Sequence, residues 1–526
     1  MKKRILSLLL ILCMVVAFLP TAAFAEEATG TLSEDSEEQQ PSQEEQSDAA
    51  AGTPVRTLAA AAIYVKEDGS DTAGLGTKEM PYATLAKAVE QASNGATIYV
   101  MSNLTMTKCA RFYSKSLTIT SDENGPYTVT RDNSFTTQSD LARSRYNPAM
   151  IEVQTTSDVG AGLTLTNIIF DDGGKKEGTA FAQAVSDGSV GAASNDNLVY
   201  VQDAIIASNA TVPTTITLGD GAVLRNFGGM SAVRVTNRAQ LVMKAGSVIE
   251  DEPAVITTRG SDADNKDAAK GPAGAVWLQG GSFTMEAGTK IQNVNGRAVY
   301  VDGGEAHIGG TISKITGNAN MWQSKMNDGT SGSAIHLRGM NASATLTSTA
   351  VIKEVSGGGS AIYVTGEGNR ITTDPKSIIT DVTNTQGIHC ASNSSAQLSG
   401  EITKVKNSVA LSLNDEAAAL LEKEGSIHNN ACTTAVVYLR AGAQLTIYGK
   451  INDNTSTDNC AALYIVTNGN SSHAILETGG EICNNSNGGS KYGAAVEVQQ
   501  GDCSFTMNGG KVVGNSGPLG AIQVHK

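Results

Sequence analysis

The chain has 526 residues, including 56 glycines, with 40% hydrophobic and 5% aromatic residues and a formal net charge of −14. Its length alone predicts three or four domains, and its apolar content is enough for a folded core. Glycine lacks the third-position repeat of collagen, and no heptads run through the chain. The acidic balance excludes nucleic acid as the main partner, since phosphate binding needs excess lysine and arginine. The few aromatics argue against an ordinary sugar-hydrolase cleft.

Residues 1–25 have the pattern of a secretory signal peptide. Residues 2–4 are Lys-Lys-Arg, residues 5–19 are almost wholly apolar, and residues 23–25 are Ala-Phe-Ala, a cleavage-type motif. The apolar run is short for a membrane span, and no second run of about 18 apolar residues follows. We therefore expect a secreted or cell-surface protein with no transmembrane segment after signal cleavage.

Residues 26–55 differ in composition from the rest of the chain. They contain nine acidic residues and no basic residue, mixed with Ser, Gln, Thr and Ala. Such a segment cannot bury enough apolar surface to offset the entropy of ordering it. We predict an acidic disordered linker here, so that much of the negative charge belongs to the linker rather than to a binding face.

The exported chain keeps six cysteines, an even number that permits disulfides. They are too few for a disulfide scaffold, and none forms a C-x-x-C pair that would indicate zinc or redox chemistry. We expect most of them to be small buried side chains, and we expect no cofactor and no metal. The cysteines are Cys109, Cys390, Cys432, Cys460, Cys483 and Cys503.

A repeat runs through the second half of the chain. A four-residue pattern of small, apolar, variable and apolar residues returns mostly every 23–27 residues, and a second pattern such as SFTMEAGTKIQNV at 282–294 often follows it. These segments are too short for helices and alternate like half-buried strands. The first pattern begins at residues 232, 275, 298, 334, 361, 387, 410, 436, 462, 495 and 521, with looser strands at 117–120, 163–170, 198–201 and 215–218.

A unit of about 25 residues cannot bury its own apolar positions, so the units are expected to stack into one continuous core. Parallel strands stack about 4.8 Å apart, so roughly fourteen coils would form a rod of about 65 Å. Glycine and asparagine suit the corners, where a positive φ is needed. Stacked asparagine side chains would form an internal ladder. The asparagines near these corners are Asn295, Asn430, Asn454, Asn485 and Asn515.

The segment at 63–100 (IYVKEDGSDTAGLGTKEMPYATLAKAVEQASNGATIYV) resembles the N-terminal part of the pectate-lyase-like superfamily. The repeats at 216–526 resemble the β-helices of bacterial surface proteins. The resemblance implies an all-β, right-handed parallel β-helix over residues 56–526. It also implies a short N-terminal capping helix that buries Leu85, Val89 and Ala92. No C-terminal cap is visible, since the sequence ends just after the first strand of a coil.

Lyases of this superfamily hold Ca²⁺ with acidic residues beside a basic residue on the outer face of one sheet. The matching positions here are Glu152, Asp171, Asp172, Asp203 and Arg234. An acid that follows a strand is also ordinary turn chemistry, and no acid repeats at one coil position as a paired glycosidase site would need. The sequence therefore leaves catalysis uncertain and favours a non-catalytic protein.

The middle residue of the first pattern points away from the core. This outward position gathers several of the chain's few aromatic residues on one exposed strand face. Two interpretations stay open: a ladder of stacked strand residues, or a surface that binds sugar rings or a protein partner. The candidate ligand-binding residues are Trp277, Tyr300, His336, Tyr363, His389, Tyr438 and Tyr464. The same outward position is occupied by Tyr200 and Arg234 in the preceding coils, by Ser412 between His389 and Tyr438, and by Glu497 and Gln523 in the last coils.

These observations predict a secreted or cell-surface, adhesin-like β-helix protein that binds glycan or protein through this face. The alternative is a polysaccharide lyase or hydrolase of the same fold, and a purely structural envelope component is a third possibility. The sequence does not determine the oligomeric state, the ligand or the mode of anchoring.

Overall fold

The structure is a computed structural model, in which every described residue belongs to one compact unit, Leu58–Lys526. The predicted signal peptide (1–25) and acidic linker (26–55) lie outside the described residues and stay predictions. The described residues are 61–132, 149–155, 159–172, 205–208, 212–227, 231–252, 274–317, 332–357, 359–458, 460–489, 495–499, 501–518 and 520–525.

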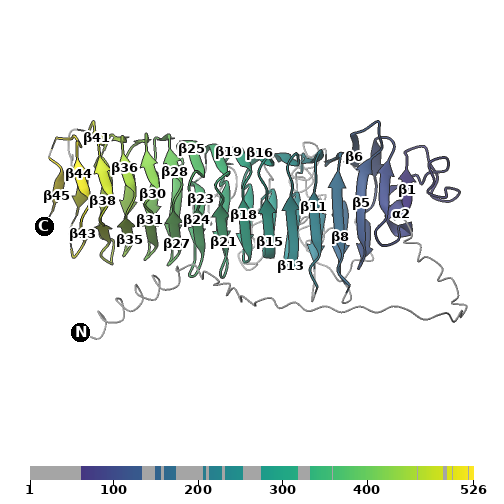
Figure 1. Cartoon of the computed structure of the whole chain (residues 1–526), viewed down its shortest axis with the longest axis horizontal. Helices are drawn as coiled ribbons and strands as arrows, with labels where there is room; N and C mark the ends of the chain where they lie inside the picture. Colours follow the sequence, from purple (N-terminus) through teal and green to yellow (C-terminus); the bar gives the residue numbers. More distant parts are fainter. Residues whose placement is uncertain are drawn as a thin grey trace, which may run out of the picture. The chain divides into compact units, whose positions relative to one another are not determined.

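The chain folds as a right-handed parallel β-helix, as the repeat and the resemblance predicted. The strands of each coil pair in parallel with their counterparts in the coils before and after, so that they form three stacks (Figure 1). We call the three stacks columns 1, 2 and 3, in the order in which the chain passes through them.

Column 1 holds the strands of the first sequence pattern, and its fourteen described members match the predicted number of coils. They are β4 (Ala110–Tyr113), β7 (Ile151–Gln154), β10 (Ile205–Ser208), the first half of β13 (Val233–Met243), the first half of β15 (Val276–Met285), β17 (Val299–Asp302), β20 (Ile335–Arg338), β23 (Ser360–Thr365), β26 (Gln386–Ala391), β30 (Leu411–Leu413), β34 (Val437–Leu439), β38 (Leu463–Ile465), β42 (Val496–Val498) and β45 (Ile522–Val524).

Column 2 continues the same sheet around the coil. Its strands are β1 (Ala62–Val65), β2 (Thr97–Val100), β5 (Ser116–Ser121), β8 (Gly162–Thr166), β11 (Thr215–Leu218), the second halves of β13 and β15, β18 (Glu305–Ile308), β21 (Ser343–Leu346), β24 (Arg370–Thr373), β27 (Ser395–Leu398), β31 (Ala418–Leu421), β35 (Gln444–Ile447), β39 (His473–Leu476) and β43 (Ser504–Met507).

Column 3 completes each coil. Its strands are β3 (Leu104–Met106), β6 (Tyr127–Arg131), β9 (Ile168–Asp171), β12 (Ala222–Arg225), β14 (Val248–Glu252), β16 (Lys290–Asn295), β19 (Thr311–Thr316), β22 (Val351–Ser356), β25 (Ile378–Thr383), β28 (Glu401–Thr403), β29 (Val405–Lys406), β32 (Ser426–His428), β33 (Ala431–Cys432), β36 (Lys450–Asn452), β37 (Thr455–Ser456), β40 (Glu481–Cys483), β41 (Ser486–Asn487) and β44 (Lys511–Val513).

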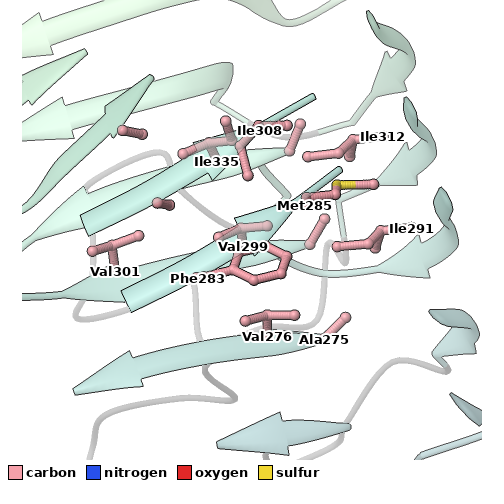
Figure 2. Packing of buried hydrophobic residues seen from close by; sticks show 14 of the residues in the cluster. Ala275, Val276, Phe283, Met285, Ile291, Val299, Val301, Ile308, Ile312 and Ile335 are labelled. Atoms are coloured by element: carbon pink, nitrogen blue, oxygen red, sulfur yellow. The ribbon is translucent and has the colours of Figure 1, made fainter. Parts of the chain in front are cut away.

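The core is one continuous cluster of apolar side chains enclosed by the coils. Alternate residues of each short strand point inward, so successive coils place a buried residue above a buried residue. The resulting cluster of buried side chains extends from Ile63 to Val498. Figure 2 shows side chains of all three columns meeting in this interior: Val276 and Val299 from column 1, Phe283 and Met285 from β15 in column 2, and Ile291 and Ile312 from column 3.

The described residues contain one helix, α2 (Leu85–Gln91), which packs against β1 and β4 near the N-terminal end of the coils. The backbone N–H of Lys87 donates to the Thr84 hydroxyl, which caps the helix N-terminus. Its buried face is Leu85, Ala88 and Val89, and Ala92 beyond it is also buried, which confirms the predicted apolar face. The helix therefore covers apolar side chains that the first coil would otherwise expose.

A bend within column 3 uses residues that the sequence did not single out. One residue per coil has a positive φ there, and in several coils it is charged rather than glycine, as in Lys314 (φ 56°), Glu354 (φ 56°) and Asp381 (φ 53°). This left-handed conformation costs a non-glycine residue about 1–2 kcal/mol. Glycine is required where two backbones approach closely: a Cβ on Gly281 would lie 2.2 Å from the Ala239 carbonyl oxygen.

The predicted asparagine ladder forms inside the last coils. Each Nδ2 donates to the Oδ1 of the asparagine in the next coil, at 2.9 Å from Asn430 to Asn454, 2.8 Å from Asn454 to Asn485 and 2.9 Å from Asn485 to Asn515. The backbone N–H groups of the same residues bond to the same Oδ1 atoms. The ladder therefore provides hydrogen bonds to buried polar groups at a corner of the coil, where strand pairing provides none.

Asn295 does not belong to this ladder, which corrects the prediction. The strand register aligns Val294, not Asn295, with Ile315, Val355 and Val382 of the following coils. Val382 pairs with Val405, whose N–H donates to Asn430 Oδ1. The inner corner position is thus apolar in the earlier coils and becomes asparagine from residue 430 onward.

Candidate functional site

The outward residues of column 1 form one register-aligned row, as predicted. Trp277 pairs with Tyr300, Tyr300 with His336, and His336 with Tyr363. The row continues through His389, Ser412, Tyr438, Tyr464, Glu497 and Gln523. Before Trp277 it contains Arg234, Ile206, Glu152 and Arg111. Ile206 occupies the place that the sequence analysis gave to Tyr200, which lies outside the described residues.

Seven of these residues have rings that contact a neighbouring ring, either stacked or edge to face, and we call these seven the ring ladder. Its first part comprises Trp277, Tyr300, His336, Tyr363 and His389, with neighbouring ring centroids 5.0–6.5 Å apart. Its second part is the pair Tyr438 and Tyr464, whose centroids lie 5.4 Å apart with planes inclined by 13°. Such ring pairs each contribute about 0.5–1.5 kcal/mol beyond their buried area.

Two arginines cover the N-terminal end of the ladder. The Arg234 guanidinium lies 4.4 Å from the centroid of the Trp277 ring, and Arg297 lies 5.0 Å from that of Tyr300. Arg234 also donates through Nε to Gln279 Oε1 at 2.8 Å. Cation–π contacts of this kind are attractive, and more so away from water. Arg234 is therefore a packing partner of the ladder in this structure.

The ladder is more buried than the sequence analysis expected, and the expectation of an exposed face is wrong for most of its members. The exposed fractions are 6% for Trp277, 8% for Tyr300, 0% for His336, 9% for Tyr363 and 8% for Tyr464. The reason is lateral packing: each outward ring covers its neighbours in the coils above and below. His389 and Tyr438 are the half-buried members.

Described residues outside the ladder also cover its second part. Tyr464 forms a small apolar cluster with Ala435, Cys460 and Val466, and Tyr438 packs against this cluster. Ala435 and Cys460 lie in the segments that precede β34 and β38. These segments therefore fold over the outer face of column 1 and shield it from water.

The two histidines of the ladder resist protonation. Burial, followed by the charges of Arg297 and Arg338, holds the pKa of His336 well below its usual 6.5. Burial and the Arg440 charge lower the pKa of His389 to about 4, against an opposing effect of Asp415. Both imidazoles are therefore neutral at pH 7. Tyr363 lies between them, as the sequence indicated, so they do not form a pair that holds one metal ion.

Three of the four acids that the sequence analysis named for Ca²⁺ are paired with an arginine. Arg111 Nε lies 2.5 Å from Glu152 Oε2, and Arg225 Nε lies 2.7 Å from Asp171 Oδ2. Asp203 lies outside the described residues.

Asp172 is paired in the same way, with Arg131. Both side chains are almost fully buried, at 0% and 2% exposed. Because these carboxylates are neutralised by partners from neighbouring coils, they act as links between coils in this structure. No group of three or more His, Cys, Asp or Glu side chains with metal-site geometry is present among the described residues.

Sequence reasoning missed Arg111 and the packing role of Arg297. A signal for Arg111 existed, because residues 109–112 (Cys-Ala-Arg-Phe) fit the small, apolar, variable, apolar pattern with Arg111 at its outward position. No comparable signal marked Arg297, which lies in the turn before β17 and places its guanidinium over the Tyr300 ring.

The described cysteines are all free thiols, and three of the six are buried. Cys390, Cys432 and Cys460 fit the expected small buried side chains, whereas Cys109, Cys483 and Cys503 are half-buried. Within the described part of the chain, no helix is long and apolar enough to span a membrane.

No protein-family model matches the chain, and no curated protein matches it in sequence. Solved structures with a similar arrangement of strands include a GH136 lacto-N-biosidase from Eubacterium ramulus, 8% identical, with a TM-score of 0.34 over 86% of this chain and 67% of that one. The receptor-binding protein of bacteriophage Det7, a tailspike, is 11% identical with a TM-score of 0.35 over 85% and 76% of the two chains. A Family 28 exopolygalacturonase from Yersinia enterocolitica is 10% identical with a TM-score of 0.27 over 89% and 78%.

Proposed function

We propose that this chain is a non-catalytic, adhesin-like protein of the bacterial surface that binds glycan through the outer face of column 1. The observation that carries the proposal is the ring ladder. A chain with 5% aromatic residues places five of them, with two histidines, in one outward row. Aromatic faces with polar edges are suited to stacking on sugar rings. The half-buried rings of His389 and Tyr438 offer the accessible faces of this row.

The ion pairs favour binding over Ca²⁺-dependent chemistry. Glu152, Asp171 and Asp172 each have an arginine partner, so a cation would have to displace a guanidinium from each of them.

The predicted signal peptide and the absence of a membrane-spanning helix among the described residues support export.

A glycan array tests the proposal with two triple variants. The first changes Trp277, Tyr300 and Tyr363 to Ala in column 1. The matched control changes Thr284, His307 and Thr372 to Ala, which are the outward residues of column 2 in the same three coils. We expect the first variant to lose glycan binding and the control to keep it, with circular dichroism to verify the fold of both.

Three results would contradict the proposal. Equal glycan binding by the wild type and the column 1 variant would make the ladder a structural element only. Binding of the wild type to a host-cell protein but to no glycan would replace the glycan by a protein partner. Turnover of acidic polysaccharides by the purified protein would instead support the lyase or hydrolase alternative.

A further inference from the structure

Column 2 has a long outer face with little charge. From β5 to β43 its thirteen strands lie side by side along the coils (Figure 1). Their register aligns the outward residues in two rows, which pass through Ser343 and Thr345 of β21. Every outward residue of these rows is half-buried or exposed, unlike most rings of column 1. More than half of them are Ser or Thr, so another surface can approach the backbone closely.

The two rows contain one acidic and one basic residue, Glu305 and Arg370, apart from their histidines. Both lie in the row of Ser343, one coil before it and one coil after it. The Glu305 side chain is 59% exposed. Arg370 donates through Nε to Thr372 Oγ1 and through Nη2 to Gln397 Oε1, both at 3.0 Å. These two bonds hold the guanidinium against the column 2 face, so its position is fixed before any partner binds.

The other two faces of the coil are less suited to a protein partner. Most outward rings of column 1 are already covered by their neighbours. The outward positions of column 3 carry charges in many coils, as in Lys290, Lys353, Glu401 and Lys450. The centres of protein interfaces are depleted of charged residues, because burying them costs free energy. Column 2 is therefore the face that a protein can cover while burying few charges.

The pattern on column 2 is complementary to itself. Consider a second copy placed face to face, with a two-fold axis that runs along β21 between the two sheets. This axis turns the coil before Ser343 onto the coil after it, so Glu305 faces the partner's Arg370, and Arg370 faces the partner's Glu305. Three coils from the axis, the outward Val242 faces the partner's Leu420. Opposite charges and apolar side chains thus meet at the same time.

We propose that two copies of this chain associate face to face through column 2, with their coils antiparallel, about an axis at Ser343 and Thr345. This inference does not depend on glycan binding. Thirteen strands of four residues form a face of about 60 Å by 13 Å, or about 800 Å² per copy. Stable protein interfaces bury about that area on each partner. A two-fold contact is closed, so the assembly stops at the dimer.

Two charge reversals test the pairing of Glu305 with the partner's Arg370. Glu305→Arg and Arg370→Glu each place like charges opposite one another at both symmetry-related positions. We expect each variant to weaken dimerisation at least tenfold in analytical ultracentrifugation, because like charges that face each other across an interface repel strongly. The matched control is Lys290→Glu, a charge reversal at an exposed outward position of column 3, which should dimerise like the wild type. Circular dichroism verifies the fold of each variant.

Mixing the two variants tests the two-fold geometry itself. In an equimolar mixture, each Glu305→Arg chain can pair with an Arg370→Glu chain so that every facing pair again has opposite charges. We expect dimers to return in the mixture, and also in the double variant Glu305→Arg/Arg370→Glu. Thr345→Arg covers the case in which a charge reversal fails to fold, since it places two like charges on the axis and should also abolish the dimer.

The outcomes divide as follows. Loss of the dimer in the single variants and its return in the mixture, with Lys290→Glu unaffected, supports the column 2 dimer. A wild type that stays monomeric at all concentrations overturns it. Wild-type dimerisation by Glu305→Arg, Arg370→Glu and Thr345→Arg would place the contact on another surface and also overturns it. A mixture that stays monomeric refutes the antiparallel arrangement.

Discussion

Tyr363 and His389 lie in neighbouring coils with ring centroids 5.1 Å apart and planes inclined by 14°. Burial, with the charge of Arg440, lowers the pKa of His389 to about 4. His336, which meets Tyr363 edge to face, is fully buried, and its pKa is held well below its usual 6.5. Burial in this ladder therefore opposes protonation of both histidines.

These two histidines predict acid sensitivity. As the pH falls below about 6.5, the unfolded chain binds protons on both imidazoles while the folded chain does not, so the free energy of unfolding decreases toward pH 4. We expect the thermal unfolding midpoint to fall between pH 6.5 and 4. The double variant His336→Phe/His389→Phe should show a smaller fall than the wild type. An identical fall in both proteins would contradict the assignment, and His307→Phe, an exposed histidine, serves as the control.

Replacing His336 by Phe at pH 7 is expected to stabilise the protein. Both ring nitrogens of His336 are buried without a hydrogen-bond partner among the described residues. An unsatisfied buried polar group costs about 1–3 kcal/mol, and a phenyl ring keeps the ladder contacts without that cost. Chemical denaturation should show an increase of about 1 kcal/mol in the free energy of unfolding. A decrease would mean that the imidazole makes a contact that phenyl cannot replace.

Asn454→Ala is expected to destabilise the last coils by about 3 kcal/mol. The substitution removes the Oδ1 that accepts from two groups of Asn430 and the Nδ2 that donates to the Ile427 carbonyl. Each buried group left without a partner costs about 1–3 kcal/mol. Asn452→Ala, at an outward and half-buried position of the same coil, is the control and should change stability little. Equal losses in the two variants would show that the ladder is not a special source of stability.

Asp172→Asn should destabilise the protein by about 3–5 kcal/mol, because it leaves the buried Arg131 guanidinium without its counter-charge. The double variant Arg131→Met/Asp172→Leu should recover much of this loss, since similar-sized apolar side chains replace the pair. Thermal unfolding of the three proteins measures both effects.

Addition of Ca²⁺ to the wild type should leave the thermal unfolding midpoint unchanged. A rise with Ca²⁺ that is absent in Asp172→Asn would restore the cation-site interpretation of this acid.

The buried thiols should not react in the folded protein. Burial raises the pKa of Cys390 and of Cys432 to about 12 and that of Cys460 well above its usual range. Thiolates are the reactive form, so iodoacetamide at pH 8 should spare these three cysteines. Cys483 and Cys503 are half-buried and should be modified before them. Mass spectrometry before and after unfolding gives the pattern, and native modification of Cys390 would show that its coil opens.

The sequence predicted the order of the outward row from Arg234 to Gln523. The reason is that strands stack in parallel and in register, so each repeat of the pattern in the sequence places one more strand on column 1. The same logic failed at Tyr200, since Ile206 pairs with Arg234 instead. It also failed at Asn295, since Val294 occupies the corner position. The error at Asn295 is a shift of one position, whereas Ile206 lies six positions after Tyr200.

By itself, the sequence determined the coil repeat and the inward and outward positions of each strand, because these follow from local alternation and a fixed period, and the covering helix was implied by the family resemblance. The tertiary structure alone decided the accessibility of the ring ladder and the partners of the acids. Arg111, Arg131 and Arg225 reach Glu152, Asp172 and Asp171 across coils, and rings cover rings from above and below. Such contacts depend on lateral packing between residues far apart in the sequence, and a periodic pattern carries no information about which side chain shields which.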